Sequence, residues 1–224
     1  MHLQFMINLK IIKPMKIVIF GASGKTGSLL VDEALSAGHD VTAYVRRPES
    51  VKSEHPNLNV VAGYLNEKDK LRSVISGSDA CISTLGGASL TKHSTAIIEG
   101  IDNILSIMEE EKVTRFIYLS SLGAGDSRKY MPQPVRFFVA DIMLRIPLAD
   151  HKTNEDRITK SQLDWTIVRP GGLTDGAKTY HMKHGFGETK IKGNLRIPRS
   201  DVAAFLLDQV TSKDYVNKSV WLYE

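Results

Sequence analysis

The sequence predicts an α/β fold, a parallel sheet with helices on both faces, for two reasons. Short runs rich in β-branched residues alternate with amphipathic stretches from residue 16 onward, the pattern of parallel strands joined by crossover helices. A glycine-rich loop also follows the first strand and opens the first helix. No linker divides the 224 residues, which suit one large domain. We therefore expect one doubly wound, Rossmann-type domain over residues 15–224.

The first half of the chain predicts four strands and three helices. Valine and isoleucine concentrate in the strands, which are expected at 16–20, 40–45, 59–62 and 79–84. Helices are expected at 26–37, 67–76 and 91–112, where apolar residues recur at helical spacing. Gly38 follows the first helix and suits its C-terminus.

The second half predicts strands at 115–119, 165–168 and 219–223, and helices at 149–161 and 201–210. Pro132, Pro134 and Pro147 limit any helix between the fifth strand and residue 149.

Composition and charge exclude several classes of protein. The net charge of +4 is spread along the chain without a block of like charges, so no nucleic-acid partner is expected. Cys81 is the only cysteine, which excludes an internal disulfide and a cysteine metal cluster and fits a cytoplasmic location. Residues 1–14 are interrupted by polar residues and are too short to span a bilayer. We expect them to be a peripheral extension, and we expect no membrane partner.

The loop Gly21-Ala22-Ser23-Gly24-Lys25-Thr26-Gly27 is the strongest functional motif. Such a loop lets backbone N–H groups approach a pyrophosphate, and the helix N-terminus adds a partial positive charge. Glycines that merely form a turn are the alternative, but the strand before and the helix after favour a dinucleotide site.

The second strand ends in Arg46 and Arg47. Folds specific for NAD place Asp or Glu here to hold the ribose 2′-hydroxyl. A guanidinium group instead suits a 2′-phosphate, so the sequence favours NADP(H) over NAD(H). Lys25 offers another positive charge, and a solvated basic strand end is the alternative interpretation.

On these motifs the sequence resembles the atypical short-chain dehydrogenase/reductase superfamily. The resemblance is to its NAD(P)H-binding branch, which includes the biliverdin-IXβ/flavin reductases and the NmrA-like proteins. The matching motifs are Ile-Phe-Gly-Ala-Ser-Gly-Lys-Thr-Gly (19–27), Val-Thr-Ala-Tyr-Val-Arg-Arg-Pro (41–48), Gly-Ser-Asp-Ala-Cys-Ile-Ser-Thr-Leu-Gly (77–86), Phe-Ile-Tyr-Leu-Ser-Ser (116–121), Leu-Asp-Trp-Thr-Ile-Val-Arg-Pro-Gly (163–171) and Ile-Pro-Arg-Ser-Asp-Val-Ala (197–203).

The resemblance implies a role for each matching segment. Residues 21–27 would hold the pyrophosphate, and Arg46 would hold the 2′-phosphate. Thr84, Leu85 and Gly86 would border the adenosine ribose and the nicotinamide. The backbone of Pro170, Gly171, Gly172 and Leu173 would contact the nicotinamide end. Ser120 and Ser121 would face the nicotinamide, and Ser121 matches the serine of the reductase active site.

Two departures from the family pattern limit the chemistry. Gly63-Tyr64-Leu65 stands where many relatives have Gly-Asp-Leu, so the adenine contact is lost or becomes a ring contact. The Tyr-x-x-x-Lys pair of the classical enzymes is missing, because Pro134 stands four residues after Tyr130. Tyrosine-based alcohol or epimerase chemistry is therefore disfavoured.

The remaining candidates for proton chemistry are Ser121 and His151. A histidine near neutral pH can donate a proton, although Asp-His-Lys at 150–152 is also an ordinary surface helix start. The two serines can equally be structural. His181 and His184 show no third metal ligand, so no metal site is expected; Tyr180 and Phe186 suggest a loop that covers the substrate.

The sequence therefore favours an NADPH-dependent oxidoreductase that transfers hydride to a flat conjugated acceptor, such as a flavin, a quinone or a biliverdin-like tetrapyrrole. One alternative is a non-catalytic NADP-binding redox sensor of the NmrA type, which would act through a protein partner. A sugar-nucleotide epimerase or dehydratase is a second alternative.

Overall fold

The computed structural model describes residues 13–87, 89–187 and 193–224. Residues 1–12, which make up most of the expected N-terminal extension, lie outside this part of the chain. The described residues form one α/β domain built on an eight-stranded sheet of order β3-β2-β1-β4-β5-β6-β10-β8. The predicted doubly wound, Rossmann-type fold is confirmed.

The strands form where the β-branched runs predicted them. The parallel strands, from one edge inward and across, are β3 (Leu58–Ala62), β2 (Asp40–Val45), β1 (Lys16–Phe20), β4 (Ala80–Ser83), β5 (Arg115–Leu119), β6 (Asp164–Pro170) and β10 (Lys218–Tyr223). The short strand β8 (Lys183–Gly185) closes the other edge and pairs antiparallel with β10. A separate two-stranded ladder joins β7 (Gly172–Thr174) to β9 (Arg196–Pro198).

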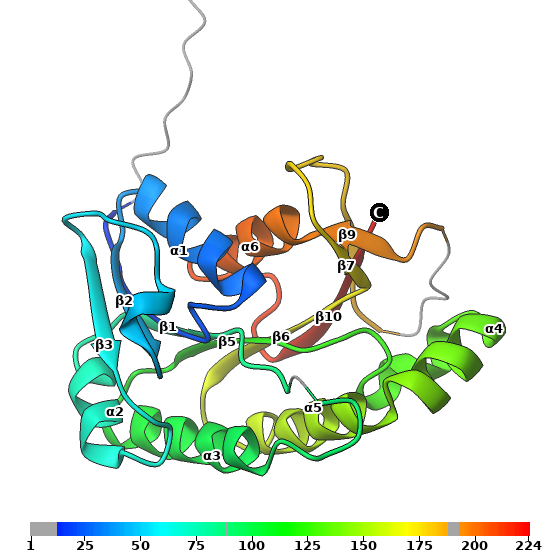
Figure 1. The fold of residues 1–224 in the computed structure, drawn as a ribbon, viewed down its shortest axis with the longest axis horizontal. Helices are drawn as coiled ribbons and strands as arrows, with labels where there is room; N and C mark the ends of the chain where they lie inside the picture. The colour runs from blue at the N-terminus through cyan, green and yellow to red at the C-terminus, as the bar shows by residue number, and fades with distance from the viewer. Residues whose placement is uncertain (1–12, 88, 188–192) are drawn as a thin grey trace, which may run out of the picture.

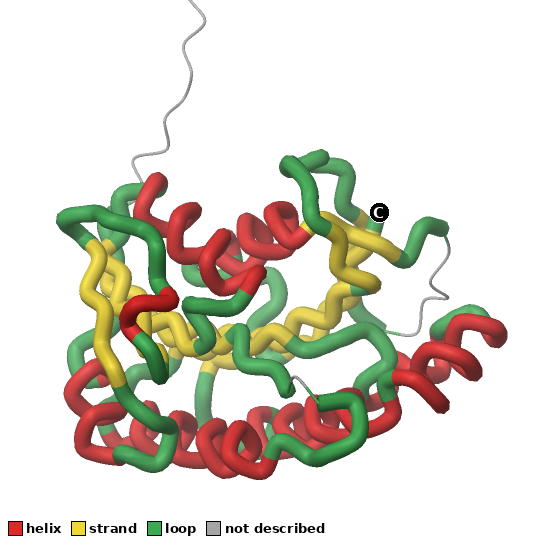
Figure 2. Tube along the Cα trace, in the orientation of Figure 1, coloured by secondary structure: helices red, strands yellow, loops and turns green. Residues whose placement is uncertain are grey.

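Helices cover both faces of the sheet (Figures 1 and 2). One layer consists of α1 (Lys25–Ser36) and α6 (Arg199–Asp208), which pack side by side. The other consists of α2 (Lys68–Ile75), α3 (Thr95–Glu110) and α5 (Arg145–Ile158). Alternate residues of each strand therefore face different layers. Ile17 and Ile19 face α1, while Val18 and Phe20 face α2 and α3.

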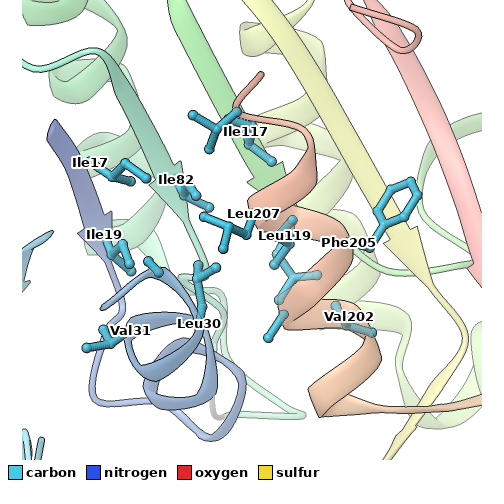
Figure 3. Close-up of a cluster of buried hydrophobic side chains, with 14 of the residues drawn as sticks. Ile17, Ile19, Leu30, Val31, Ile82, Ile117, Leu119, Val202, Phe205 and Leu207 are labelled. Atoms are coloured by element: carbon cyan, nitrogen blue, oxygen red, sulfur yellow. The ribbon is translucent and has the colours of Figure 1, made fainter. Parts of the chain in front are cut away.

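The core between the sheet and the α1/α6 layer is entirely apolar at its centre. Figure 3 shows Leu30 of α1 near Leu207 of α6, and Val31 and Val202 belong to the same buried cluster. The packing is continuous, so the first helix and the last helix of the chain depend on each other. The phosphate loop that opens α1 is thereby held by residues nearly 180 positions away.

The structure corrects several expected boundaries. The helix expected from 91 begins at Thr95, and the helix expected from 149 begins at Arg145. Pro147 lies within the first turn of α5 rather than bounding it, because first-turn N–H groups have no intrahelical partner to lose. The strands β7, β8 and β9, each of three residues, were not predicted.

Residues 125–143 are also more helical than expected. A 3₁₀ helix (Gly125–Tyr130), the short helix α4 (Gln133–Val135) and a π-helix (Arg136–Met143) lead into α5. Pro132 and Pro134 permit this because they lie before or at the start of α4.

No helix in the described ranges is long and apolar enough to cross a membrane.

Candidate functional site

The sheet reverses its strand order between β1 and β4. The chain leaves β1 toward α1 on one face, and it leaves β4 toward α3 on the other face. Ligands of open α/β sheets bind in the crevice that opens between two such diverging connections, at the carboxyl ends of the strands. The loops that follow β1 and β4 therefore define the candidate site.

The phosphate loop needs glycine for steric reasons. A Cβ atom on Gly27 would lie 2.1 Å from the carbonyl oxygen of Gly21, and Gly21 itself has φ of +82°. Only glycine adopts that conformation without strain. The loop can thus bend back tightly before α1 begins.

The N-terminus of α1 offers unpaired donors to an anion. The N-cap residue is Gly24, which brings no side-chain cap. The N–H of Ser28 is the first to bond along the helix, to the carbonyl of Gly24 at 2.8 Å. The earlier N–H groups of the helix have no intrahelical partner, so the positive end of the helix can face a phosphate.

Thr84, which directly follows the neighbouring strand β4, holds the phosphate loop in place. Its hydroxyl donates to the carbonyl oxygens of Phe20 and Gly21, both at 3.1 Å. Because the Thr84 hydroxyl is engaged in these bonds, the expected contact with the ribose would have to come from other atoms of Thr84. Gly86, by contrast, has open space where its side chain would stand, with no atom within 4 Å.

The two arginines at the end of β2 are exposed. Neither guanidinium makes an ion pair with another described residue, so both are available to a ligand. Tyr64 also exposes its side chain next to them in the fold, while its backbone is held by Tyr44 and Glu67.

Lys25 of the phosphate loop is already paired. Its Nζ lies 3.3 Å from Asp175, and the same carboxylate accepts a 2.6 Å hydrogen bond from Arg199 at the start of α6. Because Lys25 and Asp175 are both more than two-thirds exposed, this contact is weak and can open to an incoming anion.

The segment 170–173 is bound into the sheet. The N–H of Gly171 donates to Leu222, and the N–H of Gly172 donates to Leu195. The carbonyl of Pro170 accepts from Leu122. These groups are satisfied within the chain, and Leu173 lies in β7.

The two serines after β5 have different environments. Ser120 is buried and donates to Glu155 Oε1 at 2.6 Å, so its hydroxyl serves a structural contact. Ser121 is half-buried, and its hydroxyl makes only a long 3.4 Å contact to Leu122. Of the two, Ser121 has the hydroxyl that remains available to a substrate.

A buried ion pair lies beneath Ser121. Glu155 of α5 and Arg169 of β6 form two hydrogen bonds, Nε to Oε1 at 2.9 Å and Nη2 to Oε2 at 2.8 Å. Both residues are less than a tenth exposed. Arg169 also donates to Asp126 at 2.6 Å, so the pair joins α5, β6 and the turn after β5. The sequence analysis did not identify these residues, although Arg169 lay within a quoted motif.

His151 does not lie at a surface helix start, as the alternative interpretation had it. It is seven residues into α5 and packs against Tyr118 of β5, whose hydroxyl lies 2.9 Å from its Nδ1. Burial lowers the pKa of His151, although the charges of Glu155 and Asp150 oppose that shift. His151 is therefore neutral at pH 7.

The partners of Tyr118 determine which ring nitrogen carries the proton. Asn154 Nδ2 donates to the Tyr118 oxygen at 2.9 Å, so the Tyr118 hydroxyl proton is directed to Nδ1 of His151. With the Asn154 amide assigned in this orientation, neutral His151 carries its proton on Nε2. The side chain is thus a hydrogen-bond donor at Nε2. No sequence motif indicated that Tyr118 and Asn154 would determine the tautomer of His151.

The loop after β4 is tied to the same helix. Asp150, which is buried, contacts His93 Nδ1 at 2.5 Å and accepts a 2.8 Å bond from the backbone N–H of Ser94. Ser94 precedes α3, so one carboxylate joins the start of α3 to α5. Asp150 therefore anchors His93 and Ser94 to α5.

Other expected features lie away from this site. His184 belongs to the edge strand β8 and packs against Phe205 and Tyr215, so residues 183–185 are part of the sheet rather than a covering loop. Burial raises the pKa of the Cys81 thiol to about 12, which makes it unreactive. Among the residues described, no cluster of three or more His, Cys, Asp or Glu could hold a metal ion.

A cavity of about 400 Å³ lies at the amino ends of β1, β2 and β3, lined in part by Asp40, Asn57 and Ser76. Parallel sheets bind ligands at the opposite, carboxyl ends of their strands. We therefore place the candidate site at the phosphate loop and not in this cavity.

Comparison with known proteins supports the same interpretation. Residues 21–213 match a family model described as NAD(P)H-binding. A chloroplast protein of Arabidopsis thaliana, At2g34460, is 30% identical over 193 residues, which cover 82% of this chain and 68% of that protein.

Two solved structures share the fold. The anaerobillin reductase ChuY of Escherichia coli O157:H7 superposes with a TM-score of 0.77 at 24% identity, covering 93% of this chain and 97% of its own. A short-chain dehydrogenase/reductase from Veillonella parvula, solved in complex with NADP, gives a TM-score of 0.79 at 16% identity, with 94% of each chain covered.

Proposed function

This chain belongs to the NAD(P)H-binding family, and on that premise we propose that it is an NADPH-dependent reductase of a flat, conjugated acceptor such as a flavin, a quinone or a linear tetrapyrrole. The observation that carries the proposal is the pairing of a phosphate loop at the strand-order reversal with a neutral histidine donor on α5. The reductase named among the structural neighbours, ChuY, supports the acceptor class.

The residues present fit a dinucleotide. The Gly21–Gly27 loop leaves room for backbone approach, α1 presents free N–H groups, and Gly86 borders open space. Arg46 and Arg47 would hold the 2′-phosphate, which supports NADPH over NADH as the preferred form. Lys25 would exchange its exposed partner Asp175 for a phosphate oxygen.

The bound nicotinamide would supply a hydride. The chain's own residues would orient the acceptor and balance the charge that the hydride brings. A neutral imidazole is a poor acid, so His151 would not surrender its Nε2 proton. It would instead donate a hydrogen bond to the acceptor atom on which charge develops.

The proton that completes the two-electron reduction would come from solvent, relayed by Ser121. Its hydroxyl has only a weak intrachain contact and can bond a water molecule. This division of roles suits conjugated acceptors, because they delocalise the incoming charge and need no strong protein acid.

The test is NADPH oxidation by the purified protein, with FMN, riboflavin, quinones and biliverdin as acceptors, alongside calorimetric titration with NADPH. Turnover of any of these acceptors supports the reductase. Tight binding of NADPH without turnover of any acceptor overturns it and favours the redox sensor. Turnover of nucleotide sugars alone would favour the epimerase or dehydratase.

Two variants at one position test the role of His151. His151→Gln retains an N–H donor near the Nε2 position, whereas His151→Asn retains an acceptor near Nδ1 for Tyr118 and removes the distal donor. We expect His151→Asn to lower kcat by roughly 10²-fold and His151→Gln to lower it less, as for loss of one preorganised donor. Equal losses in both variants would contradict the donor role.

A further inference from the structure

The helical segment between β5 and α5 exposes a compact apolar surface. Phe137, Phe138, Ile142 and Met143 are 54%, 66%, 60% and 52% exposed. We call these four side chains the 137–143 patch. Figure 1 shows the segment, labelled at α4, extending away from the sheet beyond the end of α5.

The π-helix explains why the four side chains gather on one face. Its bonding joins residues five apart, so Phe137 lies beside Ile142 and Phe138 beside Met143 on successive turns. The Phe137 and Phe138 rings also meet edge to face, with centroids 5.2 Å apart. Ala140 is fully buried and takes the opposite face against the protein. An α-helical turn would have spread the same residues more widely.

This concentration of apolar surface is unusual for the molecule. Nine large apolar side chains are exposed in the described part of the chain, and four of them fall within these seven residues. Scattered exposed apolar residues need no explanation, but a contiguous group marks an interaction surface.

The surroundings of the patch are basic. Residues 127–149 contain four basic residues and one acidic residue, a net charge of +3 in a chain whose total is +4. The acidic residue, Asp141, is paired with Arg128. Arg136 and Arg145 flank the patch, and within the described ranges neither has an ion-pair partner.

We propose that the 137–143 patch docks the protein on the surface of an anionic lipid bilayer. The four apolar side chains would enter the boundary between headgroups and acyl chains, and Arg136 and Arg145 would meet lipid phosphates. Arg136 begins the π-helix and Arg145 begins α5. Apolar side chains flanked by arginines are typical of helices that lie in the membrane interface. A second copy of the chain fits less well, because a symmetric contact would bring the same arginines together.

The proposal departs from the expectation of no membrane partner. That expectation rested on the lack of a spanning segment, and an interfacial helix needs none. Ala140, on the buried face of the same helix, shares an apolar cluster with Leu122, the neighbour of Ser121, so docking would bring the candidate site close to the bilayer. If the proposed reductase function holds, a lipid-dissolved acceptor such as a quinone would then be its substrate.

The experiment is co-sedimentation of the full chain with vesicles, which uses no turnover and so can succeed or fail independently of the proposed function. Vesicles of phosphatidylcholine with about 30 mol% phosphatidylglycerol are compared with pure phosphatidylcholine. We expect binding to the anionic vesicles only, and we expect it to weaken at about 0.5 M salt.

Two double variants with matched controls locate the surface. Phe137→Ser/Phe138→Ser should reduce the partition coefficient at least tenfold, by about the worth of one buried phenylalanine. Leu29→Ser, an exposed position on α1 in the other helix layer, should not reduce it (Figure 1). Arg136→Gln/Arg145→Gln should reduce it roughly tenfold, and Lys52→Gln/Lys70→Gln, also exposed but distant in the fold, much less.

Three outcomes would overturn the proposal. The first is an absence of vesicle binding at every anionic fraction. The second is binding that the patch and control variants reduce equally. The third is a dimer in sedimentation velocity that Phe137→Ser/Phe138→Ser dissociates, which would show that a second copy covers the patch. Circular dichroism of each variant verifies that these surface changes leave the fold intact.

Discussion

At the scale of single residues, the candidate site separates groups that are committed to the protein from groups that remain available to a ligand. The hydroxyls of Thr84 and Ser120 are occupied by the phosphate loop and by Glu155. Among the described residues, Arg46 is exposed without an ion pair, Ser121 makes only a long contact, and the hydrogen bond of His151 lies on Nδ1 rather than Nε2.

Arg46→Ala should weaken the binding of NADPH by about tenfold to a hundredfold, the worth of a charge-assisted bond to phosphate, and leave NADH nearly unchanged. Calorimetric titration of both cofactors measures the difference. Lys70→Ala, an exposed cation on α2, serves as the control. Equal losses for NADPH and NADH in Arg46→Ala would mean that this side chain does not hold the 2′-phosphate.

The stability of the protein should fall between pH 7 and pH 5, in part because of His151. Burial lowers the pKa of His151 in the folded state, so below the ordinary histidine pKa of about 6.5 the unfolded chain binds more protons. The free energy of unfolding therefore decreases as pH falls through this window. Burial also lowers the pKa of His39, which adds to the effect.

Urea unfolding at a series of pH values measures this dependence. We expect the slope between pH 5 and 7 to be smaller in His151→Asn than in the wild-type protein, and smaller again when His39→Asn is added. An unchanged slope in the double variant would show that neither histidine is buried neutral in the folded state.

At the scale of elements, α5 is the element that organises the site. Asp150 joins it to the loop after β4, His151 to β5, and Glu155 to β6 and Ser120. The helix thus fixes the carboxyl ends of three neighbouring strands. This arrangement explains how a chain without the Tyr-x-x-x-Lys pair can still hold one side of the candidate site in a defined position.

Glu155→Gln should destabilise the protein by about 3–5 kcal/mol, because it leaves the buried charge of Arg169 uncompensated. Asp175→Asn removes a carboxylate from a pair that is exposed to solvent, and it should leave stability unchanged. Urea unfolding of both variants makes the comparison. A small loss in Glu155→Gln would indicate that water reaches the Arg169 guanidinium.

At the scale of the whole molecule, residues distant in sequence depend on each other through the α1/α6 layer. Leu206 of α6 is fully buried in the core that also holds Leu30 of α1. The phosphate loop is therefore supported by the last helix of the chain. A substitution that weakens the packing of α6 should therefore lower the affinity for the cofactor as well as the stability of the protein.

Leu206→Ala should cost about 2–5 kcal/mol of folding free energy, as for other buried leucines. It should also weaken NADPH binding, whereas Leu163→Ala, a buried change on the opposite face of the sheet, should cost stability with less effect on binding. Thermal unfolding with and without NADPH reports both quantities. Equal effects on binding would show that α6 does not support the phosphate loop.

Much of the fold and the cofactor loop could be read from the sequence, because those features depend on local patterns. Hydrophobic periodicity determines which face of a strand or helix is buried, and the spacing of Gly21, Gly24 and Gly27 reflects steric needs within one turn. The order of the strands was not predicted, because it depends on which strands pair across the sheet. The helix start expected at 91 was wrong because polar loop residues precede Thr95, and the start expected at 149 was wrong because the first turn of α5 accommodates Pro147.

Only the tertiary structure decided the environment of the site. The neutral form of His151 depends on its burial, and its tautomer depends on Tyr118 and Asn154. The role of Ser120 depends on Glu155, which lies 35 residues away along the chain. The exposed 137–143 patch likewise depends on a π-helix that places residues five apart on one face. Side-chain partners of this kind are chosen by packing across the sheet, and packing across the sheet leaves no periodic signal in the sequence.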